Sequence, residues 1–262
     1  MRVPELIEKK KRGEKIVMLT AYDFSMARVL DGAGIDIVLV GDSLGMVVLG
    51  HETTLPVTMD AMVHHTAAVS RGVRRALVMA DMPFLSCQVS VADAVRNAGR
   101  LVREGGAAAV KIEGGKPVLD VVGRLTGAGI PVMGHLGLTP QSVHRLGGYR
   151  RQATHEGDVS ALVEEAVKLE AAGAFAVLLE SIPAEAAREV TGALRVPTIG
   201  IGAGPYCDGQ VLVLYDMLGL SQDMVPPFVK KYANLGESIA RAAIEYAADV
   251  RASRFPAPKE HK

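Results

Sequence analysis

Acidic side chains stand where several apolar segments of the chain end. Asp42, Asp81 and Glu113 each follow a run of apolar, β-branched residues. Carboxylate oxygens are the hard donors that Mg²⁺ prefers, and Mg²⁺ is commonly held by one or two carboxylates that leave positions for water and substrate. No His or Cys is clustered among these acids, which disfavours zinc. The pattern predicts Asp42, Asp81 and Glu113 as ligands of a magnesium ion.

Each of these acids taken alone has a simpler explanation, because an acid just before a helix often caps the helix N-terminus. The explanation weakens when the acids stand at equivalent places after successive strands. Strand ends of a parallel barrel converge on one mouth, where unpaired carboxylates repel one another unless a cation lies among them. We therefore expect the acids to lie together.

Three further residues at strand ends have chemistry that suits an active site. Lys111 is two residues before Glu113, so both point to the same face of a strand. Lys111 is expected either to hold a substrate carboxylate or only to pair with Glu113. Glu180 follows an apolar strand, and apolar surroundings would raise its pKa and make it a better proton acceptor, although it could also cap a helix. His135 is expected either to take part in catalysis or only to pack.

Short apolar runs that alternate with helical periodicity must position these residues. Eight such runs recur, at 16–21, 35–41, 76–80, 107–112, 130–134, 175–179, 197–201 and 211–215. The stretches with helical periodicity between them are 25–33, 59–70, 91–104, 118–128, 159–172 and 184–194. Near-continuous apolar strands alternating with helices are typical of a parallel sheet that is covered on both faces.

Eight strands favour closure into a (β/α)8 TIM barrel of the α/β class, with a doubly wound open sheet as the alternative. A helix at 4–11 is expected to precede the first strand and to close the bottom of the barrel, and a last helix is expected at 237–249. We expect a single barrel domain over residues 1–262, with a frayed tail at 255–262.

Composition limits the classes of partner. The 29 Lys and Arg residues balance 29 Asp and Glu residues, which gives no reason to expect nucleic acid or an anionic membrane as the main partner. No apolar run is long enough to cross a bilayer, and the first residues do not resemble a signal peptide. The two cysteines, Cys87 and Cys207, form no disulfide framework, so we expect a cytoplasmic protein whose thiols are free.

A glycine-rich stretch, GIGAG at 200–204, follows the seventh apolar run. Such a stretch could form a phosphate cradle, as in many barrels, or could only allow close packing.

Longer motifs identify a family. The stretches TAYDFSMA (20–27), AGIDIVLVGDSLGMVVLGHETTLPVTMD (33–60), ADMPF (80–84), VKIEGG (110–115), GIPVMGHLGLTPQSVHRLGGY (129–149) and PTIGIGAGPYCDGQVLVLYDMLGL (197–220) resemble those of the ketopantoate hydroxymethyltransferase family. The resemblance covers roughly residues 3–250. Small departures are Phe24 in place of the usual Tyr, Leu85 in place of a frequent Gly, and 151–154 in place of a glycine-containing stretch.

This resemblance implies a Mg²⁺-dependent transferase of pantothenate and coenzyme A biosynthesis. Such an enzyme would enolise 3-methyl-2-oxobutanoate and transfer a hydroxymethyl group to it from 5,10-methylenetetrahydrofolate, giving 2-dehydropantoate (ketopantoate). The resemblance implies that Asp42 and Asp81 bind the metal directly and that Glu113 completes the site. Ser43 and Lys111 would hold the oxo acid together with the two aspartates, Glu180 would accept the proton, and His135 matches a family site residue. The family also implies a large, decamer-like homo-oligomer.

Two other functions compete with this interpretation. A lyase or mutase of the phosphoenolpyruvate mutase/isocitrate lyase type would share the barrel, Mg²⁺ and oxo-acid enolate chemistry, but such enzymes usually carry a reactive cysteine on a flexible loop. Neither Cys87 nor Cys207 has that setting. A non-enzymatic barrel scaffold is disfavoured by the acids expected at one mouth.

Overall fold

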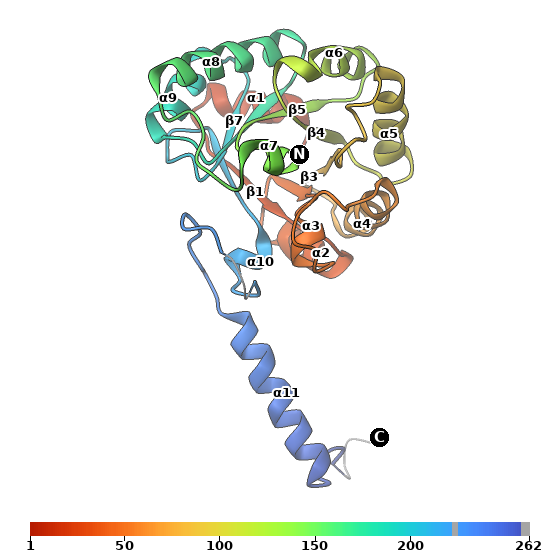
Figure 1. Cartoon of the computed structure of the whole chain (residues 1–262). Helices are drawn as coiled ribbons and strands as arrows, with labels where there is room; N and C mark the ends of the chain where they lie inside the picture. Colours follow the sequence, from red (N-terminus) through yellow and green to blue (C-terminus); the bar gives the residue numbers. More distant parts are fainter. Residues whose placement is uncertain (222–224, 258–262) are drawn as a thin grey trace. The chain divides into compact units, whose positions relative to one another are not determined.

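Eight parallel strands close into a barrel in the order β1 to β8 (Figure 1). A computed structural model describes residues 1–221 and 225–257. The strands are β1 Ile16–Thr20, β2 Ile37–Val40, β3 Leu77–Asp81, β4 Ala109–Glu113, β5 Val132–Gly137, β6 Ala176–Glu180, β7 Thr198–Ile201 and β8 Gly209–Leu212. Pairing of β1 with β8 completes the closure. The predicted (β/α)8 barrel is therefore confirmed, and the open sheet was the wrong alternative.

Alternate residues of the strands fill the barrel interior, as the period of two in a strand requires. Their side chains form a buried apolar core from Ile16, Met18, Ile37, Leu39, Leu77, Met79, Ala109, Met133, Ala176, Leu178, Ile199 and Val211. The residues between them face the outer helices, and this is why β2 and β3 are buried throughout and read as continuous apolar runs.

Helices of the βα units surround the barrel (Figure 1). They are α2 Phe24–Gly32, α3 Leu44–Val47, α4 Met59–Gly72, α5 Val91–Arg103, α6 Leu119–Gly127, α7 Val143–Leu146, α8 Glu156–Ala171 and α9 Ala184–Ala193, with short 3-10 turns η1 Lys116–Val118 and η2 Pro140–Ser142. Side-chain caps begin three of them, since Asp23, Thr58 and Ser90 accept backbone N–H bonds at the starts of α2, α4 and α5. The short helices α3 and α7 were not predicted.

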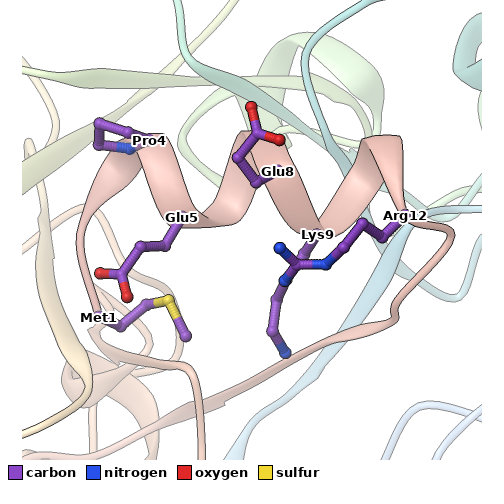
Figure 2. A pocket seen from close by; sticks show the side chains of 6 residues that line it. All are labelled: Met1, Pro4, Glu5, Glu8, Lys9 and Arg12. Carbon is purple, nitrogen blue, oxygen red and sulfur yellow. The ribbon is translucent and has the colours of Figure 1, made fainter.

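The helix α1 Val3–Lys11 closes one end of the barrel, as predicted. Its Leu6 belongs to the interior core, and Met1 and Val3 pack against that core. A cavity of about 280 Å³ lies along α1, lined by Met1, Pro4, Glu5, Glu8, Lys9 and Arg12 (Figure 2). No residue predicted for catalysis or metal binding lines this cavity, so the functional site must be sought elsewhere.

The eighth strand differs from its prediction. It covers Gly209–Leu212 instead of 211–215, and a short helix, α10 Leu214–Met217, begins where strand was expected. A Cβ on Gly209 would lie 2.5 Å from the backbone oxygen of Ile16, so only glycine allows β8 to approach β1 this closely. The predicted run at 211–215 left out Gly209 and Gln210, which start the strand.

Contacts divide the chain into two units, Met1–Val213 and Leu214–Lys262. The second unit contains α10 and α11 Leu235–Arg251, and none of the residues of α11 is buried. The prediction of one domain over 1–262 stays a prediction, and residues 258–262 of the expected frayed tail lie outside the described residues. Among the described helices, none has both the length and the apolar character that crossing a membrane requires.

Candidate active site

The predicted site residues on the strands share the inward face with the core. Asp81 continues the series Leu77 and Met79, and Lys111 and Glu113 continue from Ala109. His135 follows Met133, and Glu180 follows Leu178, by the same period of two. The strand register then sets their neighbours, since Asp81 pairs with Lys111 and Glu113 pairs with His135. A polar layer therefore lies directly above the apolar layer, at the C-terminal ends of the strands.

The end of β2 adds Asp42 and Ser43 to this layer. The backbone N–H of Asp42 donates to Oδ2 of Asp81 at 3.0 Å, which ties the ends of β2 and β3 together. The Ser43 hydroxyl lies 2.9 Å from the hydroxyl of Tyr22. A Cβ on Gly41 would lie 2.7 Å from Ser43 Oγ, so glycine leaves the room in which the serine hydroxyl sits.

Lys111 is the buried cation of the site. Its Nζ lies 3.1 Å from Asp81 Oδ1 and 3.9 Å from Glu113 Oε1. It also lies 3.1 Å from His135 Nδ1. Burial alone would lower the pKa of Lys111, but the three carboxylates of Asp81, Glu113 and Asp42 hold it above its ordinary value. Lys111 therefore keeps its positive charge. Its contacts with Asp81 and His135 go beyond the simple Lys–Glu pair that the sequence left open as an alternative.

The three predicted metal ligands do not share one electrostatic environment. Burial raises the pKa of Asp42 well above its usual range, and the nearby charges of Asp81 and Glu113 raise it further. Burial also raises the pKa of Asp81, against the opposing effect of Lys111. For Glu113 the hydrogen bond and charge of His135, with Lys111, outweigh burial and lower the pKa. A second cation near Asp42 and Asp81 would favour their ionised forms.

His135 links the two sides of the site. Its Nδ1 lies 3.5 Å from Glu113 Oε1, and its Nε2 lies 3.2 Å from Glu180 Oε2. Burial and Lys111 lower the pKa of His135, but the hydrogen bonds to Glu113 and Glu180 prevail and raise it. The carboxylate of Glu180 is 17% exposed and faces His135, so its surroundings are more polar than the apolar strand before it suggested. Glu180 is the predicted residue that both reaches the buried cluster and retains access to the mouth.

Gln141 is a residue of the site that the sequence did not reveal. Its side-chain Nε2 donates to Asp42 Oδ2 at 2.8 Å and to the carbonyl oxygen of Met82 at 2.9 Å. Its backbone N–H donates to Glu113 Oε2 at 2.9 Å. This buried glutamine thus connects the ends of β2, β3 and β4 from the segment after β5. The only sequence signal was its place in the motif GHLGLTPQS, which assigns no direction to the side chain.

The carboxylate oxygens of Asp42, Asp81 and Glu113 have the chemistry that suits a magnesium ion. Asp81 Oδ1, Glu113 Oε1 and His135 Nε2 are buried and accept or donate no aligned hydrogen bond, although ionic partners lie nearby. A buried polar atom without a hydrogen bond is costly and calls for an explanation, and a bound ion or water is one that fits here. Within the described residues, no three acidic, His or Cys side chains already converge as a preformed metal cage. Mg²⁺ does not need such a cage, since it usually takes one or two carboxylates plus water and substrate.

Other residues singled out in the sequence have structural explanations. A Cβ on Gly200 would lie 3.0 Å from Cys207 Sγ, and one on Gly204 would lie 2.4 Å from Ala184 Cβ, so close packing accounts for these glycines of GIGAG. Cys87 and Cys207 are both free and buried, as expected. Burial, with the charge of Glu113, raises the pKa of Cys87 to about 12. Leu85, which replaces a frequent Gly, has a φ of 62°, a conformation that favours glycine.

The fold and site define a β/α-barrel enzyme with a carboxylate-rich mouth. Solved structures similar to this chain include 2,3-dimethylmalate lyase, titled a PEP mutase/isocitrate lyase superfamily member (TM-score 0.63, 18% identity, 99% of this chain and 91% of that chain). Another is phosphonopyruvate hydrolase in a complex with oxalate and Mg²⁺ (TM-score 0.60, 13% identity, 97% and 88%). At these identities the likeness shows the fold alone.

Sequence comparison is more specific. The family model of ketopantoate hydroxymethyltransferase matches residues 1–258. The chain is 57% identical over 259 residues to the 3-methyl-2-oxobutanoate hydroxymethyltransferase of Moorella thermoacetica, covering 99% of this chain and 96% of the relative. It is 56% identical over 257 residues to the protein of that name from Rippkaea orientalis, covering 98% and 99%. The chain belongs to the ketopantoate hydroxymethyltransferase family, which confirms the resemblance.

Proposed function

We propose that this chain is a 3-methyl-2-oxobutanoate hydroxymethyltransferase. Its net reaction converts 3-methyl-2-oxobutanoate, 5,10-methylenetetrahydrofolate and water into 2-dehydropantoate and tetrahydrofolate, a step of pantothenate biosynthesis. The observation that carries the proposal is the family match over residues 1–258, supported by a polar layer in which buried Lys111, neighbouring carboxylates and the partly exposed Glu180 lie at one barrel mouth. The family assignment decides against the lyase, and the buried, protonated thiol of Cys87 is unsuited to the loop cysteine of such enzymes.

Asp42 and Asp81 would hold a magnesium ion, and Glu113 would complete the site. Their oxygens lie on adjacent strand ends, and the Asp42 N–H bond to Asp81 fixes the two acids relative to each other. When bound there, Mg²⁺ would withdraw electron density from the ketone of the oxo acid and stabilise the negative charge of its enolate, an effect of several kcal/mol.

Lys111 and Ser43 would orient the oxo acid beside the two aspartates. The ammonium of Lys111 is buried, charged and held between Asp81 and His135, so it offers a fixed positive charge to the substrate carboxylate. The Ser43 hydroxyl stands at the same rim and offers a hydrogen bond. A substrate held at both ends presents C3 in one direction, which reduces the entropic cost of proton transfer.

Glu180 would accept the proton from C3. Its Oε2 lies 3.2 Å from His135 Nε2, so the ring of His135 would orient the carboxylate and stabilise its charge before transfer. A positioned base contributes about 10²–10⁴-fold to a rate. The enolate would then form the new C3–C bond to the methylene carbon of the folate. The two C–N bonds of that carbon break with their electron pairs passing to the folate nitrogens, and water supplies the hydroxyl group, so that tetrahydrofolate leaves. Neither the base nor the metal alone supplies the ~8 kcal/mol at the low end of enzymatic acceleration, so both are required.

Hydrogen exchange at C3 tests this proposal without folate. With Mg²⁺ present, the protein should exchange the C3 proton of 3-methyl-2-oxobutanoate in D₂O, followed by NMR. Glu180→Gln keeps the shape of the side chain but cannot accept the proton, so it should bind the oxo acid and lose exchange by about 10²-fold or more. Lys111→Ala should mainly weaken oxo-acid binding. Exchange at the wild-type rate in Glu180→Gln would make His135 the next candidate base.

Assembly and location complete the proposal. We propose a large, decamer-like homo-oligomer, as the match to the ketopantoate hydroxymethyltransferase family implies. A sedimentation measurement that found only monomers would refute it. The free thiols of Cys87 and Cys207 support a cytoplasmic location, where thiols stay reduced.

A further inference from the structure

The segment after β5 crosses the barrel mouth. Residues 139–155, which we call the mouth segment, begin beside Gln141 with bonds to Asp42 and Glu113. Farther along, the Tyr149 hydroxyl lies 3.7 Å from the sulfur of Met46, which follows β2. These contacts lead from the end of β4 to the loop after β2, and α7, within the segment, lies in front of the strands in Figure 1.

The mouth segment then returns to the loop after β6. The backbone N–H of Gln152 donates to the carbonyl oxygen of Ser181 at 2.9 Å, and Arg151 Nη2 donates to the carbonyl oxygen of Ile182 at 3.2 Å. Ser181 directly follows Glu180, the proposed base. A co-substrate that reaches the oxo acid between β2, β4 and β6 would therefore lie beside this segment.

Charge in the mouth segment is entirely basic. It contains Arg145, Arg150 and Arg151, with His144 and His155, and no acidic residue between 139 and 155. The three arginines are exposed. In the part of the chain that the structure describes, several other arginines form ion pairs with acidic residues, but these three arginines form none. Their recorded side-chain contacts are to neutral oxygens of Ser142 and Ile182.

Tyr149 places this charge close to the chemistry. Burial and the carboxylates of Asp42, Glu180 and Glu113 together raise the pKa of Tyr149, so its ring lies within the electrostatic reach of the site. Arg150 and Arg151 follow Tyr149 directly in the chain, and both are exposed. The oxo acid has one carboxylate, and buried Lys111 already serves it under the proposed function. The exposed arginines fit a second anion that extends outward from the mouth.

We propose that Arg145, Arg150 and Arg151 bind the glutamate tail of the folate co-substrate. The inference rests on the proposed function. A folate carries at its far end one glutamate with two carboxylates, and each added glutamate brings another. Guanidinium groups suit carboxylates because their paired N–H donors match the two oxygens. Three exposed guanidinium groups on one segment, without acidic partners in the described chain, should favour folates with longer tails.

Steady-state kinetics with two co-substrates tests the assignment. The probes are 5,10-methylenetetrahydrofolate with one glutamate and with three, and the variants are Arg145→Gln and the double variant Arg150→Gln/Arg151→Gln. Wild type should have the lower KM for the triglutamate, and sodium chloride should raise that KM by screening. The double variant should raise the triglutamate KM by about tenfold and change the monoglutamate KM less. The kcat should change little, because the arginines do not touch the reacting atoms.

A matched control is the pair Arg71→Gln and Arg124→Gln. Both are exposed arginines in the last turns of α4 and α6, at the opposite end of the barrel from the mouth, and both should retain the wild-type KM values. Equal triglutamate KM values in wild type and in the double variant would overturn the assignment. Loss of folate-independent C3 exchange in the double variant would also overturn it, because the arginines would then act on the oxo acid. A wild type that forms no 2-dehydropantoate with either folate would instead overturn the proposed function.

Discussion

Replacing Gln141 by Met should weaken magnesium binding without unfolding the protein. Methionine has a similar length but no N–H, so Asp42 Oδ2 and the Met82 carbonyl oxygen both lose their donors. The backbone bond from residue 141 to Glu113 remains, because the main chain supplies it. Of the bonds lost with the side chain, only the one to Asp42 involves a proposed metal ligand, and the Gln88→Met control separates out the bond to Gln88.

The size of the effect follows from that interaction. A hydrogen bond to a charged group contributes about 1.5–3 kcal/mol. Removing an outer-shell partner of a metal ligand typically costs about 10–100-fold in affinity. That loss corresponds to about 1.4–2.7 kcal/mol, so the two estimates agree. We expect the Kd for Mg²⁺ to rise by about 10–100-fold in Gln141→Met, because Asp42 is no longer held in one orientation.

Isothermal titration with Mg²⁺ in the presence of 3-methyl-2-oxobutanoate measures this change, and Mn²⁺ paramagnetic resonance provides a second readout. The control is Gln88→Met, which removes the 3.3 Å bond to Gln141 Oε1 and the bond accepted from the Cys87 N–H but leaves the Gln141 bond to Asp42. An unchanged Mg²⁺ affinity in a folded Gln141→Met protein would refute the reasoning. A wild type that bound no Mg²⁺ would refute the metal site itself.

Two further predictions concern groups that take no part in the reaction. With its pKa raised to about 12, Cys87 should react with iodoacetamide far more slowly in the native protein than in urea at pH 8, and equal rates would contradict its burial. Asp31 accepts N–H bonds from Arg74, Arg75 and Ala76, and these outweigh burial and lower its pKa. Asp31→Ala should lower the free energy of unfolding by about 2–4 kcal/mol at pH 7. Because the folded pKa is depressed, this difference should persist above about pH 4 and shrink as the pH falls through the folded pKa, which urea titrations at pH 7 and 3 would show.

The sequence predicted the barrel because its strands are buried on both faces. Continuous apolar runs marked seven of the strands to within a few residues, for example Thr198–Ile201 against the predicted 197–201. The eighth strand was misplaced because it begins at Gly209, where the close approach of β8 to β1 leaves no room for a side chain. The hydrophobicity pattern does not reveal that requirement. The short helices α3 and α7 were missed because four residues are too few to show a period.

The sequence predicted those features of the candidate site that depend on the alternation of side chains between the two faces of a strand. Lys111 and Glu113 share a face by their spacing of two, and the structure places both in the inward layer. The closeness of His135 to Glu180 depends instead on the register between β5 and β6, which the barrel geometry fixes. Gln141 was missed because its role depends on a segment that turns back over the mouth, and the sequence gives no signal of that path.

The acids of the mouth had one competing explanation, that each caps a helix, and the structure removes it. The side chains that cap helix N-termini in the described part of the chain are Asp23, Thr58 and Ser90. The helix after Asp42 begins without a side-chain cap, and the helix after Glu180 has Pro183 at its N-cap. Asp42 is instead buried beside another acid, and burial raises its pKa despite the hydrogen bond from Gln141 and the charge of Lys111. Ionising acids that are buried together is costly, and a cation bound among them, as proposed above, would offset that cost.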